Sequence, residues 1–227
     1  MSDPETETRM LRVYRFKRGD GGEHFDEFEV PTGPRTTVLD ALRWIQLNRD
    51  PSLAVRHSCL HASCGTCGVQ VDGHEELACV CAMRDQGQEV TVEPLANLPI
   101  LTDLVVDMDE FFARFPDEHP IIRRSEGEYV RLEDCIECGL CLSACPVAAT
   151  SRHYVGPAAL VAAQRLLEEP RGADCEAVVD WADRPEAAWG CHVGLECTRA
   201  CPADAIPAER IMALRHRLTL DGKDGGS

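Results

Sequence analysis

Residues 57–73 read HSCLHASCGTCGVQVDG and place cysteines at Cys59, Cys64 and Cys67. A fourth cysteine, Cys79, follows after eleven further residues. This Cys-x4-Cys-x2-Cys spacing with a later cysteine is the ligand pattern of plant-type 2Fe-2S clusters. The loop is rich in small residues, so it can close around a cluster and offer backbone N–H groups to its sulfurs. We therefore expect these four cysteines to hold a 2Fe-2S cluster.

Two alternatives stay open at this loop. By spacing alone, Cys81 competes with Cys79 for the role of fourth ligand. A zinc site that uses Cys64 and Cys67 is the weaker alternative, because a structural zinc pair would not require Cys59 as well.

The sequence around this loop predicts a small mixed sheet and one helix. Apolar and polar residues alternate in 11–17 and 25–30, with a glycine-rich turn between them, which indicates a hairpin. An apolar stripe along 38–48 predicts a helix that Thr36 or Thr37 can cap. Further strands are expected at 69–71 and 89–93, the first of them turning at Asp72-Gly73. Residues 10–105 are thus expected to form a β-grasp domain of the plant-type 2Fe-2S ferredoxin kind, in an α+β fold.

The pattern becomes helical after about residue 100. Apolar residues from Leu101 to Phe115 recur at three- and four-residue spacing until Pro116, which predicts a helix. A second helix should begin at Gly156-Pro157 and run through Leu167, and a last one should begin at Pro207. We expect residues 106–220 to form an all-α domain that resembles bacterial ferredoxins in its cysteine motifs.

Two further cysteine groups lie in this second part. Residues 134–146 read DCIECGLCLSACP, which is the bacterial ferredoxin run, and in such runs the fourth cysteine binds the other cluster of a pair. Residues 191–202 read CHVGLECTRACP and fit the same template except at its second position. There Gly194 stands in place of a cysteine, and glycine has no side chain to bind iron.

Crossed ligation then assigns both clusters. Four thiolates for a 4Fe-4S cluster come from Cys135, Cys138, Cys141 and Cys201. Three thiolates, from Cys145, Cys191 and Cys197, suit a 3Fe-4S cluster, whose fourth corner has no iron. A labile 4Fe-4S cluster with a non-protein fourth ligand is the alternative that spacing does not exclude. Cys175 and one of Cys79 and Cys81 are left over, and we interpret them as ordinary side chains.

Composition and charge narrow the class of protein. The chain has 227 residues with 23 basic and 39 acidic side chains, a net charge of -16, so nucleic acid is not an expected partner. No stretch approaches the roughly 20 apolar residues of a spanning helix, and the acidic start does not resemble a secretion signal. Any membrane attachment is therefore expected through partner chains. In such a setting the thirteen cysteines are expected to be reduced thiols.

No catalytic residue is expected in this chain. It contains no Gly-x-Gly-x-x-Gly loop, no Gly-x-Ser-x-Gly sequence, no Walker motif and no convincing acid–base pair. Three redox centres instead indicate a conduit that passes electrons one at a time. A partner must handle electron pairs, and a flavin would do so.

The order of the three motifs resembles the iron–sulfur subunit of succinate dehydrogenases and fumarate reductases. The similarity extends to ELAC at 76–79, EPLANLPILTDLVVDM at 93–108 and YVGPAAL at 154–160. It implies an electron-transfer subunit of a succinate:quinone oxidoreductase, which operates in the tricarboxylic acid cycle or in fumarate reduction. It also favours Cys79 over Cys81, because Leu77-Ala78-Cys79 matches the Leu-Ala-Cys of the family.

The resemblance further implies the partners and the location. A flavoprotein subunit would carry covalent FAD, and membrane anchor subunits would bind quinone and in some members haem b. Electrons would pass between FAD and quinone through the 2Fe-2S, 4Fe-4S and 3Fe-4S clusters. The chain would lie at the cytoplasmic face of the membrane, held by the anchor subunits.

The resemblance places quinone beside the 3Fe-4S cluster. Pro146 and His192 stand at the matching positions and are the quinone-site candidates, although His192 could equally form only local hydrogen bonds. Ubiquinone-reducing members carry a Trp-Trp pair after the Cys-Pro, whereas this chain has Val-Ala-Ala-Thr at 147–150. This difference favours the fumarate-reductase or menaquinone branch.

Other functional classes fit the sequence less well. A soluble multi-cluster ferredoxin would not need two cluster domains joined by the LPILTDLVVDM segment. The iron–sulfur subunit of a thiol-linked fumarate reductase would add a Cys-Cys-Gly-rich domain, which this sequence lacks. A purely structural zinc protein is the third alternative.

Overall fold

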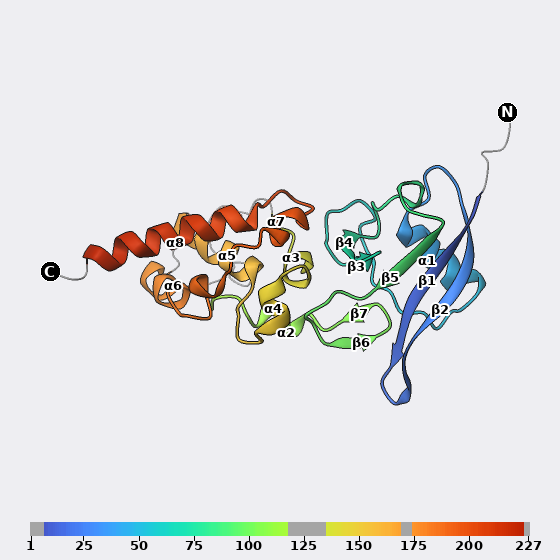
Figure 1. Cartoon of the computed structure of the whole chain (residues 1–227), viewed down its shortest axis with the longest axis horizontal. Helices are drawn as coiled ribbons and strands as arrows, with labels where there is room; N and C mark the ends of the chain where they lie inside the picture. Colours follow the sequence, from blue (N-terminus) through green and yellow to red (C-terminus); the bar gives the residue numbers. More distant parts are fainter. Residues whose placement is uncertain (1–6, 118–134, 169–173, 225–227) are drawn as a thin grey trace, which may run out of the picture. The chain divides into compact units, whose positions relative to one another are not determined.

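The computed structural model describes residues 7–117, 135–168 and 174–224 (Figure 1). Contacts divide the chain into two compact units. The first comprises Met1–Met108 and Ile136–Leu140, and the second comprises Asp109–Cys135 and Cys141–Ser227. The division therefore falls at 108/109, where the sequence suggested 105/106, and the segment Ile136–Leu140 belongs with the first unit.

The first unit is a mixed sheet with one long helix. Its elements are β1 (Glu7–Lys17), β2 (Asp20–Thr32), α1 (Val38–Asn48), β3 (Gly68–Val71), β4 (His74–Leu77), η1 (Met83–Asp85), β5 (Glu89–Glu93), β6 (Ile100–Thr102) and β7 (Val105–Val106). The strand order is β4-β3-β5-β1-β6-β7, and β2 also pairs with β1. The long β1–β2 hairpin is antiparallel, whereas β1 and β5 run parallel (Figure 1).

Helix α1 confirms its sequence prediction at both ends. Thr37 is the N-cap, and it exchanges hydrogen bonds with Asp40 in a capping box. The predicted apolar stripe is buried, and it consists of Val38, Leu39, Ala41, Leu42 and Ile45. The N–H groups of Val38 and Leu39, which have no partner within the helix, donate to the carbonyls of Cys81 and Ala78 at 2.8 and 2.9 Å. The helix thereby fixes the chain segment around Cys79.

The helix predicted from Leu101 to Phe115 is wrong. The structure forms β6 and β7 in its first half, and only Asp109–Phe112, α2, is helical. Asp103, between the two strands, has a left-handed φ of 44°, which a helix does not allow. Its buried carboxylate accepts hydrogen bonds from the N–H groups of Phe16 and Ala54 at 3.0 and 2.8 Å. These distant contacts outweigh the local helical periodicity.

The described part of the second unit contains helices and no strand. They are α2 (Asp109–Phe112), α3 (Leu140–Ser143, begun in the first unit), α4 (Pro146–Thr150), α5 (Pro157–Glu168), α6 (Cys175–Ala182), η3 (Ala188–Gly190), α7 (Glu196–Arg199) and α8 (Pro207–Asp224). Helices α5 and α8 confirm the predictions made from their prolines and apolar stripes, whereas α6 was not predicted. Within residues 7–117, 135–168 and 174–224, none of the helices has both the length and the apolar content needed to cross a bilayer.

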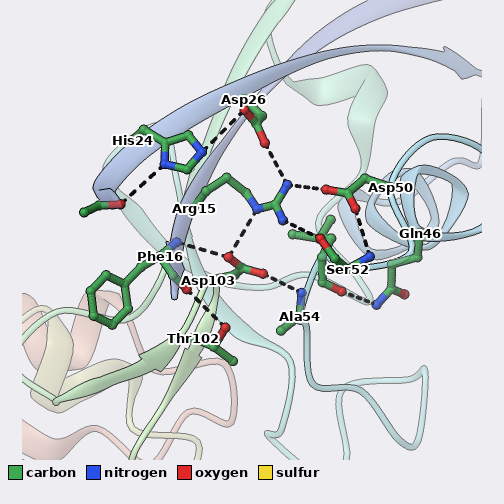
Figure 2. A network of polar contacts seen from close by, with 12 residues as sticks. Arg15, Phe16, His24, Asp26, Gln46, Asp50, Ser52, Ala54, Thr102 and Asp103 are labelled. Carbon is green, nitrogen blue, oxygen red and sulfur yellow. Dashed lines mark hydrogen bonds and ion pairs between the residues drawn. The ribbon is translucent and has the colours of Figure 1, made fainter. Parts of the chain in front are cut away.

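A buried arginine joins four segments of the first unit (Figure 2). The Arg15 guanidinium donates to carboxylates of Asp26 at 2.7 Å, Asp50 at 2.5 Å and Asp103 at 3.2 Å, and to the Ser52 hydroxyl at 3.0 Å. Only 6% of the Arg15 side chain and 1% of the Asp103 side chain are exposed. The network therefore holds β1 against β2, the segment after α1 and the β6–β7 turn.

The charge state of Asp50 depends on this network. Burial alone would raise the pKa of Asp50, but hydrogen bonds from Ser52 and Arg15 lower the pKa to about 2. Folding lowers the pKa of Asp50 below its ordinary value of 3.8, so the ionised carboxylate stabilises the folded state fully above about pH 4. It is lost as the pH falls towards 2.

Arg15→Met is expected to destabilise the first unit strongly. Removing the guanidinium leaves the buried Asp103 carboxylate without an opposite charge, and breaking a buried ion pair in this way costs about 3–5 kcal/mol. The measurement is urea denaturation followed by far-UV circular dichroism. The control is Arg12→Met on the same strand, because Arg12 is exposed and lies over the Phe25 ring at 4.0 Å. Equal midpoints for the two variants would contradict a structural role for the network.

Candidate functional site: three groups of thiols

The first cysteine loop, residues 57–68, turns its backbone N–H groups towards sulfur. The Sγ of Cys59 accepts N–H hydrogen bonds from His61, Ser63 and Cys64 at 3.5, 3.3 and 3.4 Å. The Ala62 N–H donates to the Sγ of Cys79 at 3.3 Å. Left-handed backbone at Leu60 and Ala62 produces this arrangement, with φ of 64° and 59°. Successive N–H groups oriented in this way form the concave anion site found around many iron–sulfur clusters.

The remaining ligand candidates of this loop lie beside those two cysteines. Burial raises the pKa of Cys67 to about 12, and the neighbouring Cys79 and Cys64 thiols add to this rise. A hydrogen bond with the Cys79 backbone opposes it. The Ala78 N–H donates to the Cys67 carbonyl at 3.1 Å, so the segment before Cys79 is tied to the loop. The structure thus brings together all four predicted ligands: Cys59, Cys64, Cys67 and Cys79.

Cys64 has the opposite electrostatic setting to Cys67. Burial alone would raise the pKa of Cys64, but hydrogen bonds with Thr66 and Cys59 lower it to about 6. The Thr66 hydroxyl lies 3.1 Å from its sulfur. A thiol of this kind readily becomes the thiolate that binds metal.

Cys81 lies in different surroundings from the other members of its group. Burial raises the pKa of Cys81 to about 11, and the charges that add to this effect belong to carboxylates, those of Glu76, Asp85 and Asp72. Its sulfur accepts a hydrogen bond from the Gln86 amide at 3.5 Å. The charges that act on the Cys81 thiol thus belong to carboxylates, whereas those that act on Cys67 belong to thiols.

The four cysteines predicted to bind the 4Fe-4S cluster are assigned to both units. Cys138 belongs to the segment Ile136–Leu140 of the first unit, whereas Cys135, Cys141 and Cys201 belong to the second. Cys141 is buried in α3, and Cys135 and Cys138 are half-buried. The Sγ of Cys201 accepts the Ala205 N–H at 3.3 Å, which gives it the same kind of N–H···S contact as the first loop.

The third thiol group joins cysteines from three segments of the second unit. Burial raises the pKa of Cys197 to about 11, and the neighbouring Cys191 and Cys145 thiols add to the rise. Burial likewise raises the pKa of Cys145. The neighbouring Cys191 thiol adds to this rise, whereas hydrogen bonds from the N–H groups of Ala148 and Val147 oppose it. Cys145, at the end of the second motif, therefore lies with Cys191 and Cys197 of the third, as crossed ligation requires.

The loop 191–195 uses backbone geometry like that of the first loop. Val193 and Leu195 have φ of 58° and 65°, and the Val193 N–H donates to the Sγ of Cys191 at 3.3 Å. The φ of Gly194, which lies between them, is outside the left-handed region. A Cβ built on Gly194 would lie 3.6 Å from Pro146 Cγ. There is thus space for a side chain at position 194.

Arg215 supports the start of this loop. From α8 its guanidinium donates to the carbonyls of Ala188 at 2.7 Å, Trp189 at 3.1 Å and Cys191 at 2.5 Å, and it lies 5.6 Å from the Trp189 ring centroid. Sequence reasoning did not single out Arg215. An arginine on the helix that follows the motif gives no signal of which carbonyls it will reach.

The two quinone-site candidates lie at the surface. Pro146 and His192 are exposed, and Pro146 is adjacent to Gly194. Large apolar side chains close to His192 in the sequence are also exposed, with Trp189 at 43%, Val193 at 40% and Leu195 at 48%. An apolar rim of this kind beside a functional loop is typical of an interaction surface.

The donor sets fit clusters better than single ions. Among residues 7–117, 135–168 and 174–224, no group of three or more His, Cys, Asp and Glu side chains could hold a lone metal ion. A zinc ion would need such ligands within about 2.3 Å of one point. In an iron–sulfur cluster the thiolates bind different irons, so their sulfurs lie further apart.

Comparisons with known proteins agree with the donor sets. Residues 10–113 match the family model of a 2Fe-2S iron-sulfur cluster binding domain, and residues 131–205 match that of a 4Fe-4S dicluster domain. The fumarate reductase iron-sulfur subunit of Mycobacterium tuberculosis is 35% identical over 86% of this chain and 85% of its own length. The Escherichia coli O157:H7 fumarate reductase iron-sulfur subunit is 34% identical over 91% of each chain.

Two further relatives extend this similarity. The succinate dehydrogenase iron-sulfur subunit of Paracoccus denitrificans is 31% identical over 94% of this chain and 89% of its own length. A chain of the Mycobacterium smegmatis Sdh1 complex in the apo form superposes with a TM-score of 0.83 at 26% identity, covering 98% of this chain and all of that one.

Proposed function

Because the chain belongs to the family of iron-sulfur subunits of succinate dehydrogenases and fumarate reductases, we propose that it relays electrons between a flavin and a quinone through three clusters. Its electron-transfer role as a subunit of this oxidoreductase follows from the family, as does its α+β fold with 2Fe-2S and 4Fe-4S domains. We also propose which residues bind each cluster, that one cluster is of the 3Fe-4S type, and which partner subunits the chain contacts.

Each proposed cluster has its own ligand set. The 2Fe-2S cluster takes Cys59, Cys64, Cys67 and Cys79; the 4Fe-4S cluster takes Cys135, Cys138, Cys141 and Cys201; the 3Fe-4S cluster takes Cys145, Cys191 and Cys197. When bound, each cluster would accept and release one electron. The protein would supply thiolates, N–H groups directed at sulfur, and burial, which together set the redox potential.

The N–H···S contacts are the observation that carries this function. They occur at Cys59 and Cys79, with donors from the first loop, at Cys201, and at Cys191 in the loop 191–195. Donors of this kind stabilise the negative charge of cluster sulfur and would raise its potential. The mixed sheet with α1 supports a plant-type β-grasp domain over 10–105, and the helices support an all-α cluster domain over 106–220.

The 3Fe-4S proposal rests on the third group of thiols. Cys145 lies near Cys191 and Cys197, and Gly194 supplies no fourth thiol where the motif requires one. Three thiolates leave one corner of a cubane without a protein ligand. Iron at that corner would need a non-protein ligand, as in a labile 4Fe-4S cluster, whereas a three-iron cluster needs none, and we therefore propose the three-iron cluster.

The proposed partners lie on either side of the relay. Electron pairs would enter at a flavoprotein subunit with covalent FAD, because this chain has no two-electron group. Quinone would bind near Pro146 and His192, and the exposed side chains of Trp189, Val193 and Leu195 would face membrane anchor subunits, which in some members of the family carry haem b. We place the chain at the cytoplasmic face of the membrane, held by those subunits.

Anaerobic purification followed by low-temperature EPR tests this function. The expected result is co-purification with a yellow flavoprotein and small hydrophobic chains. EPR should then show reduced-state signals of two clusters and an oxidised-state signal from the third. A soluble ferredoxin would purify alone and without the oxidised-state signal, and a thiol-linked enzyme would reduce fumarate with thiols and not with quinol.

Cys81→Ser is expected to leave the 2Fe-2S cluster in place, because the Cys81 sulfur accepts a hydrogen bond from the Gln86 amide and lies near carboxylates, which raise its pKa. Its matched partner Cys79→Ser should lose the cluster, since Ala62 directs an N–H at the Cys79 sulfur. The measurement is the visible absorption and reduced-state EPR signal of the 2Fe-2S cluster in the two variants. Loss of the signal in Cys81→Ser alone would reverse the assignment.

A further inference from the structure

Tyr154 lies in the segment between α4 and α5, which belongs to none of the cysteine motifs. It is part of the second unit, and only 2% of the residue is exposed. The Tyr154 N–H donates to the Ser151 carbonyl at 3.3 Å, and the Tyr154 carbonyl accepts a hydrogen bond from Arg114 Nη1 at 2.9 Å. The backbone that carries this buried ring is therefore held on both sides.

The ring of Tyr154 lies against the start of the third cysteine motif. A Cβ built on Gly190 would lie 2.8 Å from Tyr154 Cδ2, closer than real side chains approach, and 3.4 Å from Tyr154 Cε2. The ring edge that leads to the hydroxyl thus runs beside the residue that precedes the proposed ligand Cys191. The Cys191 carbonyl in turn accepts a hydrogen bond from Arg215 at 2.5 Å. The fold therefore holds both the tyrosine ring and the ligand beside it in place.

The hydroxyl of Tyr154 reaches the third group of thiols. Burial raises the pKa of Tyr154, and the Cys191 and Cys145 thiols add to this rise, as does a hydrogen bond between the hydroxyl and Cys191. A smaller contribution comes from Cys197. The hydroxyl therefore lies near all three proposed ligands of the 3Fe-4S cluster. At neutral pH a tyrosine hydroxyl can donate a hydrogen bond, and cysteine sulfur can accept one.

We propose that Tyr154 donates a hydrogen bond to the Cys191 sulfur and thereby raises the reduction potential of the 3Fe-4S cluster. The inference rests on the proposed function, because it requires the ligand set proposed for that cluster. Reduction adds one electron, which comes from the partner flavin through the relay and leaves towards quinone, and the tyrosine keeps its proton throughout. The added negative charge lies partly on sulfur, so an O–H donor stabilises the reduced state more than the oxidised state.

Tyr154→Phe is expected to lower this reduction potential and to leave the cluster in place. Phenylalanine keeps the ring that packs on Gly190 and removes only the hydroxyl. Loss of a hydrogen bond to a charged group should lower the equilibrium constant for reduction about tenfold, which corresponds to about 59 mV for one electron. The measurement is a redox titration of the oxidised-state EPR signal in the purified complex.

Tyr14→Phe is the matched control. Tyr14 is also a buried tyrosine, but it lies on β1 in the first unit, so its hydroxyl should have no effect on this potential. A second readout separates hydrogen bonding from packing. Electron–nuclear double resonance of the oxidised cluster should detect an exchangeable proton that is present in Tyr14→Phe and missing in Tyr154→Phe.

The outcomes separate this inference from the proposed function. Absence of the oxidised-state signal from the unsubstituted protein would defeat the proposed 3Fe-4S cluster itself. An intact signal with an unchanged potential in Tyr154→Phe would overturn only the role of Tyr154, as would an equal shift in Tyr14→Phe. If Tyr154→Phe does not assemble the cluster, the titration is made on Gly190→Ala. Its methyl group meets the Tyr154 ring and should move the hydroxyl away from Cys191, so a lowered potential supports the inference and an unchanged one overturns it.

Discussion

Cys201→Ser is expected to eliminate the 4Fe-4S cluster and to leave the 3Fe-4S cluster intact, although Cys201 belongs to the same motif as two 3Fe-4S ligands. Cys145→Ser is expected to do the reverse. The physical reason is the grouping of the thiols, because Cys145 lies with Cys191 and Cys197. Cys191 adds to the rise in the pKa of Cys145, and Cys145 adds to the rise in the pKa of Cys197. Removing one thiolate from either set leaves too few ligands to retain the iron of that cluster.

The measurement is EPR of each variant in the reduced and oxidised states. Cys201→Ser should lose the reduced-state 4Fe-4S signal, and Cys145→Ser should lose the oxidised-state 3Fe-4S signal. Cys175→Ser is the control that should keep every signal, because Cys175 is half-buried at the start of α6 and belongs to none of the three thiol groups. Survival of the 4Fe-4S signal in Cys201→Ser would show that the ligation is not crossed.

Gly194→Cys is expected to convert the third site into a four-thiolate site. Position 194 is where the motif requires its second cysteine, and a Cβ there makes only an ordinary contact of 3.6 Å with Pro146 Cγ. The Cβ of a new cysteine therefore has space, and it lies in the loop that already contributes Cys191. The fourth corner could then hold iron, so a 4Fe-4S cluster should replace the 3Fe-4S cluster.

Two measurements check this conversion. The oxidised-state EPR signal should disappear, because an oxidised 4Fe-4S cluster gives none, and the iron content should rise from about nine to about ten atoms per chain. Gly194→Ala is the matched control, which adds a Cβ without a thiol and should keep the signal. An unchanged signal in Gly194→Cys with a properly folded protein would count against the three-ligand account.

The sequence was most informative where local spacing determines the structure. Helices α1, α5 and α8 begin at the capping threonine or at the prolines that the sequence indicated. The cysteines of the first loop and of the third thiol group come together as the motif spacing implied. In each case the deciding residues are close in sequence, or a motif fixes their relation.

Long-range contacts decided what the sequence did not predict. The segment around Asp103 has a helical apolar pattern, but Arg15 and the N–H groups of Phe16 and Ala54 bind its carboxylate and impose a strand pair. The contact of Gly65 with Cys138 joins residues more than seventy positions apart, and no periodicity reports it. The same is true of Arg215 and the carbonyl of Cys191.

Iron and acid-labile sulfide analysis of the anaerobically purified chain tests the central claim most directly. The claim is that eleven thiols, some exchanged between distant motifs, hold three clusters. It predicts about nine iron atoms and about ten sulfides per chain, with no stoichiometric zinc. Far less iron, absent sulfide, or zinc in its place would contradict the claim and the electron-relay mechanism built on it.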